Sequence, residues 1–292
     1  MKLVLSNENS LLEAIHELVL GASNRTLRQF LQHGRVRLNG ATSKIATQHV
    51  VPGDVVEIVT QGDSHPTISG LKIVYEDKDI ILIEKPTGLL TVATPHEQEK
   101  TAYAYLRQYL KERNPKQKLF IVHRLDKFAS GVLVFAKSEP VQAKLQALFS
   151  RHDIRRKYWA IVEGRLEKDH GTIRSYLAEN RANRMHSIED GSDGKLAVTH
   201  FCVLKRFPRL TVLEVTLETG RKNQIRAHLA EMGHPIVGDR AYGSTMNPMG
   251  RLGLHAFLLG FKHPILGTPI EHKTKVPPEF SRYLTHRQSK EE

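Results

Sequence analysis

The sequence has little cysteine and no long hydrophobic run. Its 292 residues contain one cysteine, Cys202, which excludes an intramolecular disulfide and a cysteine-based zinc site and indicates a reducing cytoplasm. No apolar segment approaches the roughly 18 residues that a membrane-spanning helix needs, and the polar residues that begin at Ser6 are atypical of a signal peptide. We therefore expect a cytoplasmic protein. Because Cys202 lies in a strand-like segment, we expect a buried, structural thiol.

Acidic residues are also scarce relative to basic ones. The chain holds 31 Asp and Glu against 43 Lys and Arg, which gives a net charge of +12. Residues 1–60 are close to neutral, so nearly all of the excess lies in the rest of the chain. This surplus predicts a polyanionic partner. No basic amphipathic helix of the membrane-binding kind stands out, which favours nucleic acid over a membrane surface.

The first 62 residues are predicted to form a small α/β domain. Ser10 and Glu13 have the spacing of a capping box before a first helix, and a second helix is expected over 24–33. A strand at 35–38, an Asn-Gly turn and a closing element at 50–59 follow. This order resembles the small RNA-binding domain first seen in ribosomal protein S-four. We expect RNA contacts from Arg25, Arg28 and Arg35, although a merely solvated helix face would show the same pattern.

After a polar linker at 63–70, residues 71–292 are predicted to form a larger α+β domain. Many strands and only a few helices, among them 101–113 and 138–149, favour a mostly antiparallel, mixed sheet, since the regular strand-helix alternation of a parallel sheet is missing. Residues 168–194 are polar and are expected to form an irregular surface excursion.

A charged loop around Asp126 is the first candidate site. Two apolar segments, 120–122 and 132–136, are predicted to be buried strands that flank the loop and hold it rigidly. Three basic residues lie within three positions of Asp126, namely His123, Arg124 and Lys127. Nearby positive charge favours an ionised carboxylate that can act as a nucleophile. The alternative is an Asp that accepts hydrogen bonds within its own turn.

A second candidate site follows a predicted strand and glycine turn within residues 217–229. The beginning of a helix favours anions, and donors for phosphate oxygens are expected there from Arg221, Lys222 and Gln224. A buried Arg226 would need an acidic partner, and Asp126 is the candidate. No metal site is expected, because metal-ligand spacing is missing from His228, His234, His255 and His263.

Several motifs in one order resemble the RluA family of pseudouridine synthases. The resemblance covers about residues 71–270 and rests on His123-Arg124-Leu125-Asp126 with the following Ser-Gly pair, and on the segments 83–88, 157–164, 194–199, 219–229 and 233–243. It implies isomerisation of uridine to pseudouridine in structured RNA, without cofactor or metal. The family's catalytic aspartate corresponds to Asp126, its active-site tyrosine to Tyr158, and the basic partner of the aspartate to Arg226. Arg124 corresponds to the residue that fills the space left by the extruded base.

The chain departs from the family pattern at two positions beside these groups. Ala129 replaces a frequent threonine and Asn223 a frequent histidine, which affects positioning and target choice more than the reaction. Asp126 is compatible with attack on the ribose, attack on the base, or promotion of elimination at the sugar. Tyr158 fits stacking on uracil, with a core tyrosine as the alternative.

Two functions from different classes are compatible with these observations. The first is a pseudouridine synthase that acts as a monomer on ribosomal RNA, most naturally that of the large subunit, with transfer RNA as the other substrate class. The second is a non-catalytic RNA-binding or ribosome-assembly protein, in which the same basic surface binds RNA and Asp126 is only structural.

Overall fold

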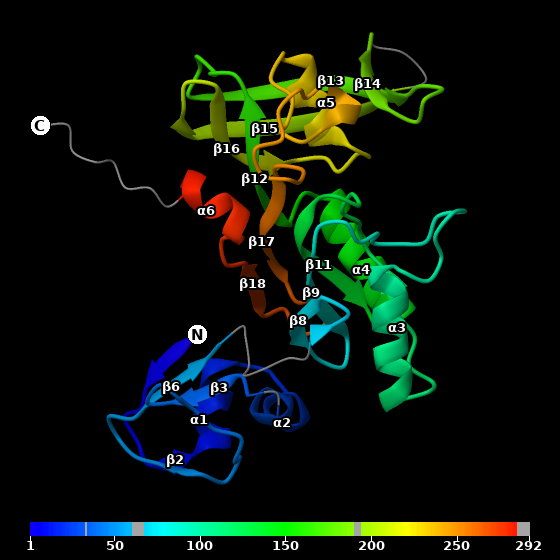
Figure 1. Ribbon diagram of the computed structural model, residues 1–292. Coiled ribbons are helices and arrows are strands. Elements are labelled where there is room, and N and C mark those ends of the chain that lie inside the picture. Colours follow the sequence, from blue (N-terminus) through cyan, green and yellow to red (C-terminus); the bar gives the residue numbers. More distant parts are fainter. Residues whose placement is uncertain (33, 60–66, 190–193, 285–292) are drawn as a thin grey trace, which may run out of the picture.

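The computed structural model describes residues 1–32, 34–59, 67–189 and 194–284 (Figure 1). We call residues 1–59 the N-terminal unit and residues 67–284 the body. Of the predicted linker 63–70, positions 63–66 lie outside the described residues, as do positions 60–62 of the predicted small domain. Residues Thr67–Ile68 of the predicted linker form strand β7, which pairs with the body's sheet.

The N-terminal unit packs two helices against a small sheet. Its helices are α1 (Leu11–Leu18) and α2 (Asn24–Gln32). The four-stranded sheet has the order β1 (Lys2–Val4), β6 (Val55–Ile58), β3 (Val36–Leu38), β4 (Ala41–Thr42), and β2 (Asn9–Ser10) pairs with β5 (His49–Val50). The predicted capping box is confirmed, because Ser10 Oγ accepts from the Glu13 amide and the Glu13 carboxylate accepts from the Ser10 amide.

The second helix divides its residues as its periodicity predicts. Leu27, Phe30 and Leu31 are buried in the unit's core, whereas Arg25 and Arg28 are exposed. The helix begins at Asn24, and position 33, the expected last residue, lies outside the described residues. The apolar stripe thus fixes the helix on the sheet and leaves the arginines to solvent.

The body is built on a twelve-stranded sheet. Ten of its strands follow one path, in the order β14 (Met185–Ile188), β13 (His170–Glu179), β15 (Lys195–Arg206), β16 (Leu210–Leu217), β12 (Arg155–Glu163), β17 (Leu254–Lys262), β11 (Ser130–Ala136), β9 (Ile80–Lys85), β8 (Leu71–Glu76), β7 (Thr67–Ile68). Two short strands lie off this path, β10 (Phe120–Ile121) beside β11 and β18 (Pro269–Lys273) beside β17. The predicted α+β class with a mixed sheet is confirmed.

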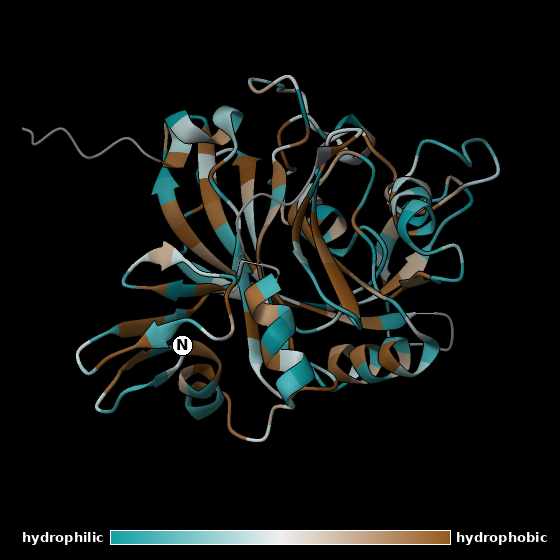
Figure 2. Ribbon diagram, turned by 90° about the horizontal axis from the view of Figure 1, so that it is seen from below, coloured by the Kyte–Doolittle hydropathy of each residue, from teal (hydrophilic) through white to brown (hydrophobic). Residues whose placement is uncertain are grey.

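Helices cover both faces of this sheet. On one face α3 (Ala102–Arg113) and α5 (Gln224–Glu231) share a core with alternate strand residues, and on the other α4 (Glu139–Ser150) and α6 (Pro278–Leu284) do so. A short 3₁₀ helix, η1, spans Arg240–Tyr242. Figure 2 shows how strongly hydrophobic the central strands are, as burial on both faces requires. None of the helices within the described ranges is long and apolar enough to cross a membrane.

A single parallel pairing joins the strands from β14 to β17 to the strands from β11 to β7. Strands β11 and β17 pair at Ser130 with His255 and at Gly131 with Ala256, whereas the other pairings are antiparallel. Gly131 has φ of +124°, and a Cβ added there would lie 2.1 Å from the Ala256 carbonyl oxygen. Only glycine permits this approach. The Ser-Gly pair after the charged loop therefore fixes the loop's exit from the sheet.

The strands at the β14 end of the sheet differ from the prediction in two ways. Residues 168–194 were expected to be irregular, but 170–179 and 185–188 form the antiparallel hairpin of β13 and β14. Much of β13 is exposed or half-buried, so the sequence carries only a weak hydrophobic pattern. Cys202 was expected to be buried, but it is exposed, because β15 turns its neighbour Phe201 inward instead.

Arg35 is enclosed where the N-terminal unit meets the body. It is 4% exposed and lies over the rings of Phe30 and Tyr75, 4.2 and 4.6 Å from their centroids. Its Nε donates to the Val59 carbonyl (3.1 Å) and its Nη1 to the Tyr75 hydroxyl (3.0 Å). The expected RNA contact of Arg35 is therefore wrong, because its side chain is buried and its donors are engaged by Val59 and Tyr75.

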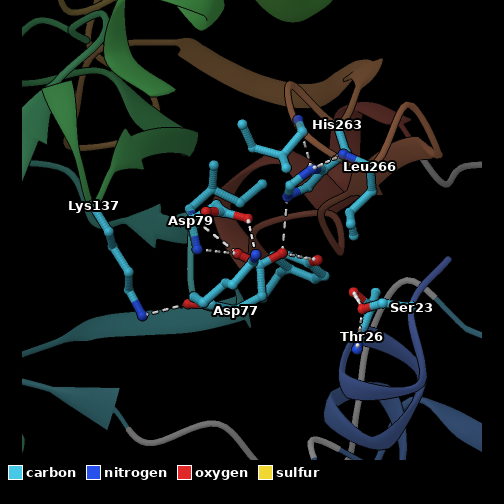
Figure 3. A network of polar contacts seen from close by, with 11 residues as sticks. Ser23, Thr26, Asp77, Asp79, Lys137, His263 and Leu266 are labelled. Carbon is cyan, nitrogen blue, oxygen red and sulfur yellow. Dashed lines mark hydrogen bonds and ion pairs between the residues drawn. The ribbon is translucent and has the colours of Figure 1, made fainter. Parts of the chain in front are cut away.

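The Tyr75 hydroxyl that accepts from Arg35 donates in turn to Asp77, which Figure 3 shows with its other partners. Asp77 Oδ2 accepts from the Tyr75 hydroxyl (2.5 Å) and from His263 Nε2 (2.9 Å). His263 Nδ1 accepts from the amides of Ile265 and Leu266, so Nε2 must carry the ring proton. Burial by itself raises the pKa of Asp77, but the hydrogen bonds from His263 and Tyr75 outweigh it and lower that pKa to about 2.

Asp77, Asp79 and His263 are also grouped tightly enough to suggest a cation site. One ligand atom from each lies within 4.8 Å of the others. However, both oxygens of Asp77 and both ring nitrogens of His263 are engaged by protein partners. The cluster is therefore a hydrogen-bonded joint between segments, and a cation would have to displace these bonds.

Replacing Asp77 with Asn should lower the free energy of unfolding at pH 7 by about 2 kcal/mol. Because the folded-state pKa lies below the ordinary value of 3.8 for an aspartate, the ionised group stabilises the fold above that pH and its contribution fades as pH falls toward 2. Urea unfolding at pH 7 and pH 3 should show the deficit of D77N shrinking at the lower pH. The exposed control D153N should stay within about 0.5 kcal/mol of wild type. A deficit that does not change with pH would contradict this assignment.

Candidate active site

One cavity of about 610 Å³ brings most of the candidate residues together. It lies between the loop 122–129, the end of α4, strand β12 and the segment 217–226. This volume is typical of a site for a small ligand or a single base. Seven of the predicted site residues line it, namely Arg124, Asp126, Tyr158, Arg221, Lys222, Gln224 and Arg226.

The loop that carries Asp126 is fixed by backbone and side-chain hydrogen bonds from residues 85–91. Thr91 Oγ1 donates to the Leu125 carbonyl (2.7 Å) and accepts from the Leu125 amide (3.1 Å). Thr87 Oγ1 donates to the Phe128 carbonyl (2.7 Å). The loop is thus held on both sides of Asp126, whose side chain is 23% exposed and reaches the cavity.

Lys85 adds a buried amino group next to this loop. Its Nζ donates to three carbonyl oxygens, those of Pro86 (2.9 Å), Leu89 (2.7 Å) and Lys127 (3.2 Å). Burial lowers the pKa of Lys85 to about 7, and the nearby Asp126 opposes that shift. Because all of these acceptors are backbone atoms, Lys85 positions the loop and does not face a ligand.

Arg226 lies within salt-bridge reach of Asp126, as expected. Its Nη1 is 3.5 Å from Asp126 Oδ2, and Nη1 also donates to Asn223 Oδ1 (2.9 Å). The stronger partner is Asp239, which accepts from Nε (2.7 Å) and Nη2 (2.9 Å). Burial would lower the pKa of Arg226, but the hydrogen bonds and charge of Asp239 raise it. The site therefore contains a fixed cation beside Asp126.

Tyr158 forms part of the cavity wall and is 8% exposed. Burial raises the pKa of its phenol, the nearby Arg156 acts in the opposite direction, and the charge of Asp126 raises the pKa further. The phenol is therefore neutral at physiological pH. It offers an aromatic face and a hydroxyl to a ligand, and no basic phenolate.

His123 does not act as a cation near Asp126. Burial lowers the pKa of His123 to about 3, and the charge of Arg156 lowers it further. Its Nε2 accepts from the Val134 amide (3.2 Å), and its ring packs on Phe149 at 4.6 Å. The expectation that His123 stabilises the carboxylate by its charge is wrong, because partial burial of the ring disfavours its charged form and the Val134 amide occupies Nε2.

The residues that were expected to contact RNA and are exposed separate into three groups. Arg124, Arg221 and Lys222 are exposed and line the cavity. Lys127 is exposed on the same loop, where its Nζ lies 5.4 Å from the Phe128 ring centroid. Arg25 and Arg28 are exposed on the N-terminal unit.

Gln224 does not fit the predicted role of a phosphate donor. It is buried, and its side-chain amide donates to the Val198 carbonyl and to Thr199 Oγ1 while its oxygen accepts from Thr219. These bonds connect the beginning of α5 to strand β15. Gln224 therefore shapes the wall of the cavity, and its donors are unavailable to RNA.

The sequence reasoning gave no site role to three residues, Lys85, Arg156 and Asp239. Asp239 and Lys85 lie inside segments that carried the family resemblance, so motif position was the available signal. Arg156 lines the cavity two positions before Tyr158 on β12. Its spacing from Tyr158 would have placed both on one face of the strand.

Comparisons with known proteins show which family the chain belongs to. A family model described as RNA pseudouridylate synthase matches residues 79–231. The chain is 34% identical over 271 residues to an uncharacterized RNA pseudouridine synthase of Bacillus subtilis, covering 90% of this chain and 88% of that protein. It is 32% identical over 285 residues to the ribosomal large subunit pseudouridine synthase D of Escherichia coli, covering 91% and 87%.

Among solved structures, the human RNA pseudouridylate synthase domain containing 4 has the same fold. Its TM-score is 0.61 at 24% identity, with 73% of this chain and 92% of that chain covered. The human RNA pseudouridylate synthase domain containing 1 gives a TM-score of 0.59, covering 76% and 89%. The likeness in structure therefore extends over most of the chain described here.

Removing Asp239 should destabilise the fold far more than removing Asp126. Asp239→Ala leaves the mostly buried Arg226 without its two-bond partner, which should cost about 3 kcal/mol. Asp126→Ala removes a partly exposed carboxylate at 3.5 Å and should change stability by at most about 1 kcal/mol. Denaturant unfolding at pH 7 measures both. Equal losses would show that Arg226 depends on Asp126 for its place.

Proposed function

The chain belongs to the RNA pseudouridylate synthase family and is an RNA pseudouridine synthase, and from this premise we propose that it isomerises uridines of ribosomal RNA with Asp126 as the catalytic carboxylate. One observation carries the assignment of Asp126. Among the described residues that line the cavity, Asp126 is the only acidic one. The guanidinium of Arg226, 3.5 Å from Asp126 Oδ2, places a fixed positive charge beside it.

The reaction defines what the cavity must do. The bond from ribose C1′ to uracil N1 breaks and a bond from C1′ to C5 forms, while N1 gains a proton and C5 loses one. The detached uracil has to turn without leaving, so an enclosed wall is needed. Tyr158 supplies an aromatic face for this base. Because its phenol is neutral, Tyr158 adds no second negative charge next to Asp126.

Access to a uridine in folded RNA requires that its base leave the stack. Flipping costs a few kcal/mol, which contacts to phosphates and stacked bases can offset. Arg124 is exposed at the cavity beside Asp126, and we expect it to occupy the space that the base leaves. Arg221 and Lys222 are available to bind the RNA backbone on the other side.

The substrate class rests on the relatives and on the N-terminal unit. Relatives named for the large ribosomal subunit align over about nine tenths of this chain. The unit's two helices and small sheet have the order expected of an S-four-like domain, and Arg25 and Arg28 are exposed on its second helix. We assign RNA binding to this unit, and we assign a uridine of large-subunit ribosomal RNA as the substrate of the cavity.

Asp126→Asn should abolish pseudouridine formation and spare RNA binding. The change is nearly isosteric but removes the charge, so the single-turnover rate should fall by at least about 10³-fold while the dissociation constant changes by no more than about threefold. Carbodiimide labelling of ribosomal RNA, read by primer extension, measures the product. The exposed control Asp153→Asn should retain wild-type activity. Product formation by D126N at the wild-type rate would remove the catalytic assignment and favour a purely RNA-binding protein.

Neutralising Arg221 should reduce the salt dependence of RNA binding more than neutralising Lys222. Each phosphate contact contributes about 0.7 to 0.9 to the slope of log K against log salt. Lys222 is ion-paired with Glu179, which compensates part of its charge, whereas Arg221 Nε donates only to the Leu196 carbonyl. Filter binding across a salt series should therefore show a larger decrease in this slope for R221Q than for K222Q. The control K111Q, on exposed α3 surface outside the cavity, should leave the slope unchanged, and an unchanged slope in R221Q would contradict the assignment.

A further inference from the structure

Arg156 is a buried cation in the wall of the same cavity, and the chemistry described above does not use it. It is 8% exposed and lines the cavity together with Tyr158. Its neighbours along β12 behave differently. Arg155 pairs with Glu271 at 2.7 Å and Lys157 with Glu214 at 2.5 Å, and neither lines the cavity. The strand thus places one of three consecutive basic residues at the site.

The guanidinium of Arg156 lacks a full set of partners. Its Nη2 donates to the carbonyls of Leu217 (3.3 Å) and Glu218 (2.9 Å). Its Nε is buried with no acceptor, and within the described ranges Arg156 forms no ion pair. A buried charge without a counter-charge is costly unless an anion completes the site. In Arg156 this unfavourable desolvation of a charged group occurs in the wall of the cavity.

The surroundings make room for the guanidinium. A Cβ added at Gly220 would lie 2.8 Å from Arg156 Nη1, so a glycine there leaves the space open. On another side the Phe149 ring lies 5.2 Å from the guanidinium carbon. The exposed side chains of Arg221 and Lys222 follow Gly220 directly and line the same cavity. This wall is therefore positively charged and is built from two segments far apart in sequence.

We propose that Arg156 binds a backbone phosphate of the RNA next to the uridine whose base contacts Tyr158. This inference rests on the proposed function. Uracil is neutral, so the phosphodiester is the anion that the substrate brings, and a guanidinium matches phosphate oxygens with paired donors. Two residues along a strand span roughly 6.6 Å, which is within the reach of one nucleotide. The phosphate would then orient the ribose so that C1′ faces Asp126.

The test changes the phosphate and the arginine together. A ribosomal RNA fragment that the wild-type protein modifies is synthesised with a single neutral methylphosphonate linkage on the 5′ or the 3′ side of the target uridine. With wild type, one of these linkages should raise KM by about 10- to 100-fold, the range for loss of a hydrogen bond to a charged group. R156Q should show a similar loss with natural RNA and no further loss with the neutral linkage. The control R155Q should leave the effect of the linkage intact.

Two outcomes would overturn the inference. Losses from R156Q and from the neutral linkage that simply multiply would show that the two groups do not interact, which leaves Arg156 only as support for the 217–218 turn. If R156Q does not fold, wild type alone decides, because normal KM with both neutral linkages excludes the contact. Wild-type activity on natural RNA separates this failure from failure of the proposed function, which would give no pseudouridine on any RNA.

Discussion

Asp239 holds the guanidinium of Arg226 with two hydrogen bonds, and this buried ion pair fixes the cation that faces Asp126. Because Asp239 orients the guanidinium, Arg226 can face Asp126 without forming a closer, two-bond contact with it. Asp126 therefore stays 3.5 Å away, partly exposed and free to meet a ligand. One carboxylate thus holds the buried cation in place, and the other stays available at the cavity.

The sheet brings the parts of this arrangement together. The parallel contact of β11 with β17 at Gly131 fixes where the loop with Asp126 leaves the sheet, and β17 in turn pairs with β12, which carries Tyr158. Hydrogen bonds from Thr87, Thr91 and Lys85 hold the loop from below. Asp126 is thus on a loop, but its position is determined by strands and buried donors.

Local patterns predicted most of the elements correctly. The capping box at Ser10, the beginning of α2 and the helices near 101–113 and 138–149 all depend on neighbours within a turn of the chain. Predictions that depend on which surface a segment meets were less successful. Arg35 and Gln224 look like exposed donors in sequence but are buried by packing partners, and Cys202 faces outward because its neighbour Phe201 turns inward.

The sequence alone determined the family resemblance and the α+β class, and it singled out Asp126, Tyr158 and Arg226 as candidate site residues, because motif order and periodicity are properties of the chain itself. Only the tertiary structure decided which charges are paired. Asp239 lies 13 positions after Arg226, and the partners of Arg156 lie 61 and 62 positions away along the chain. Charge, burial and pairing depend on contacts between distant segments, and those contacts exist only once the sheet has formed.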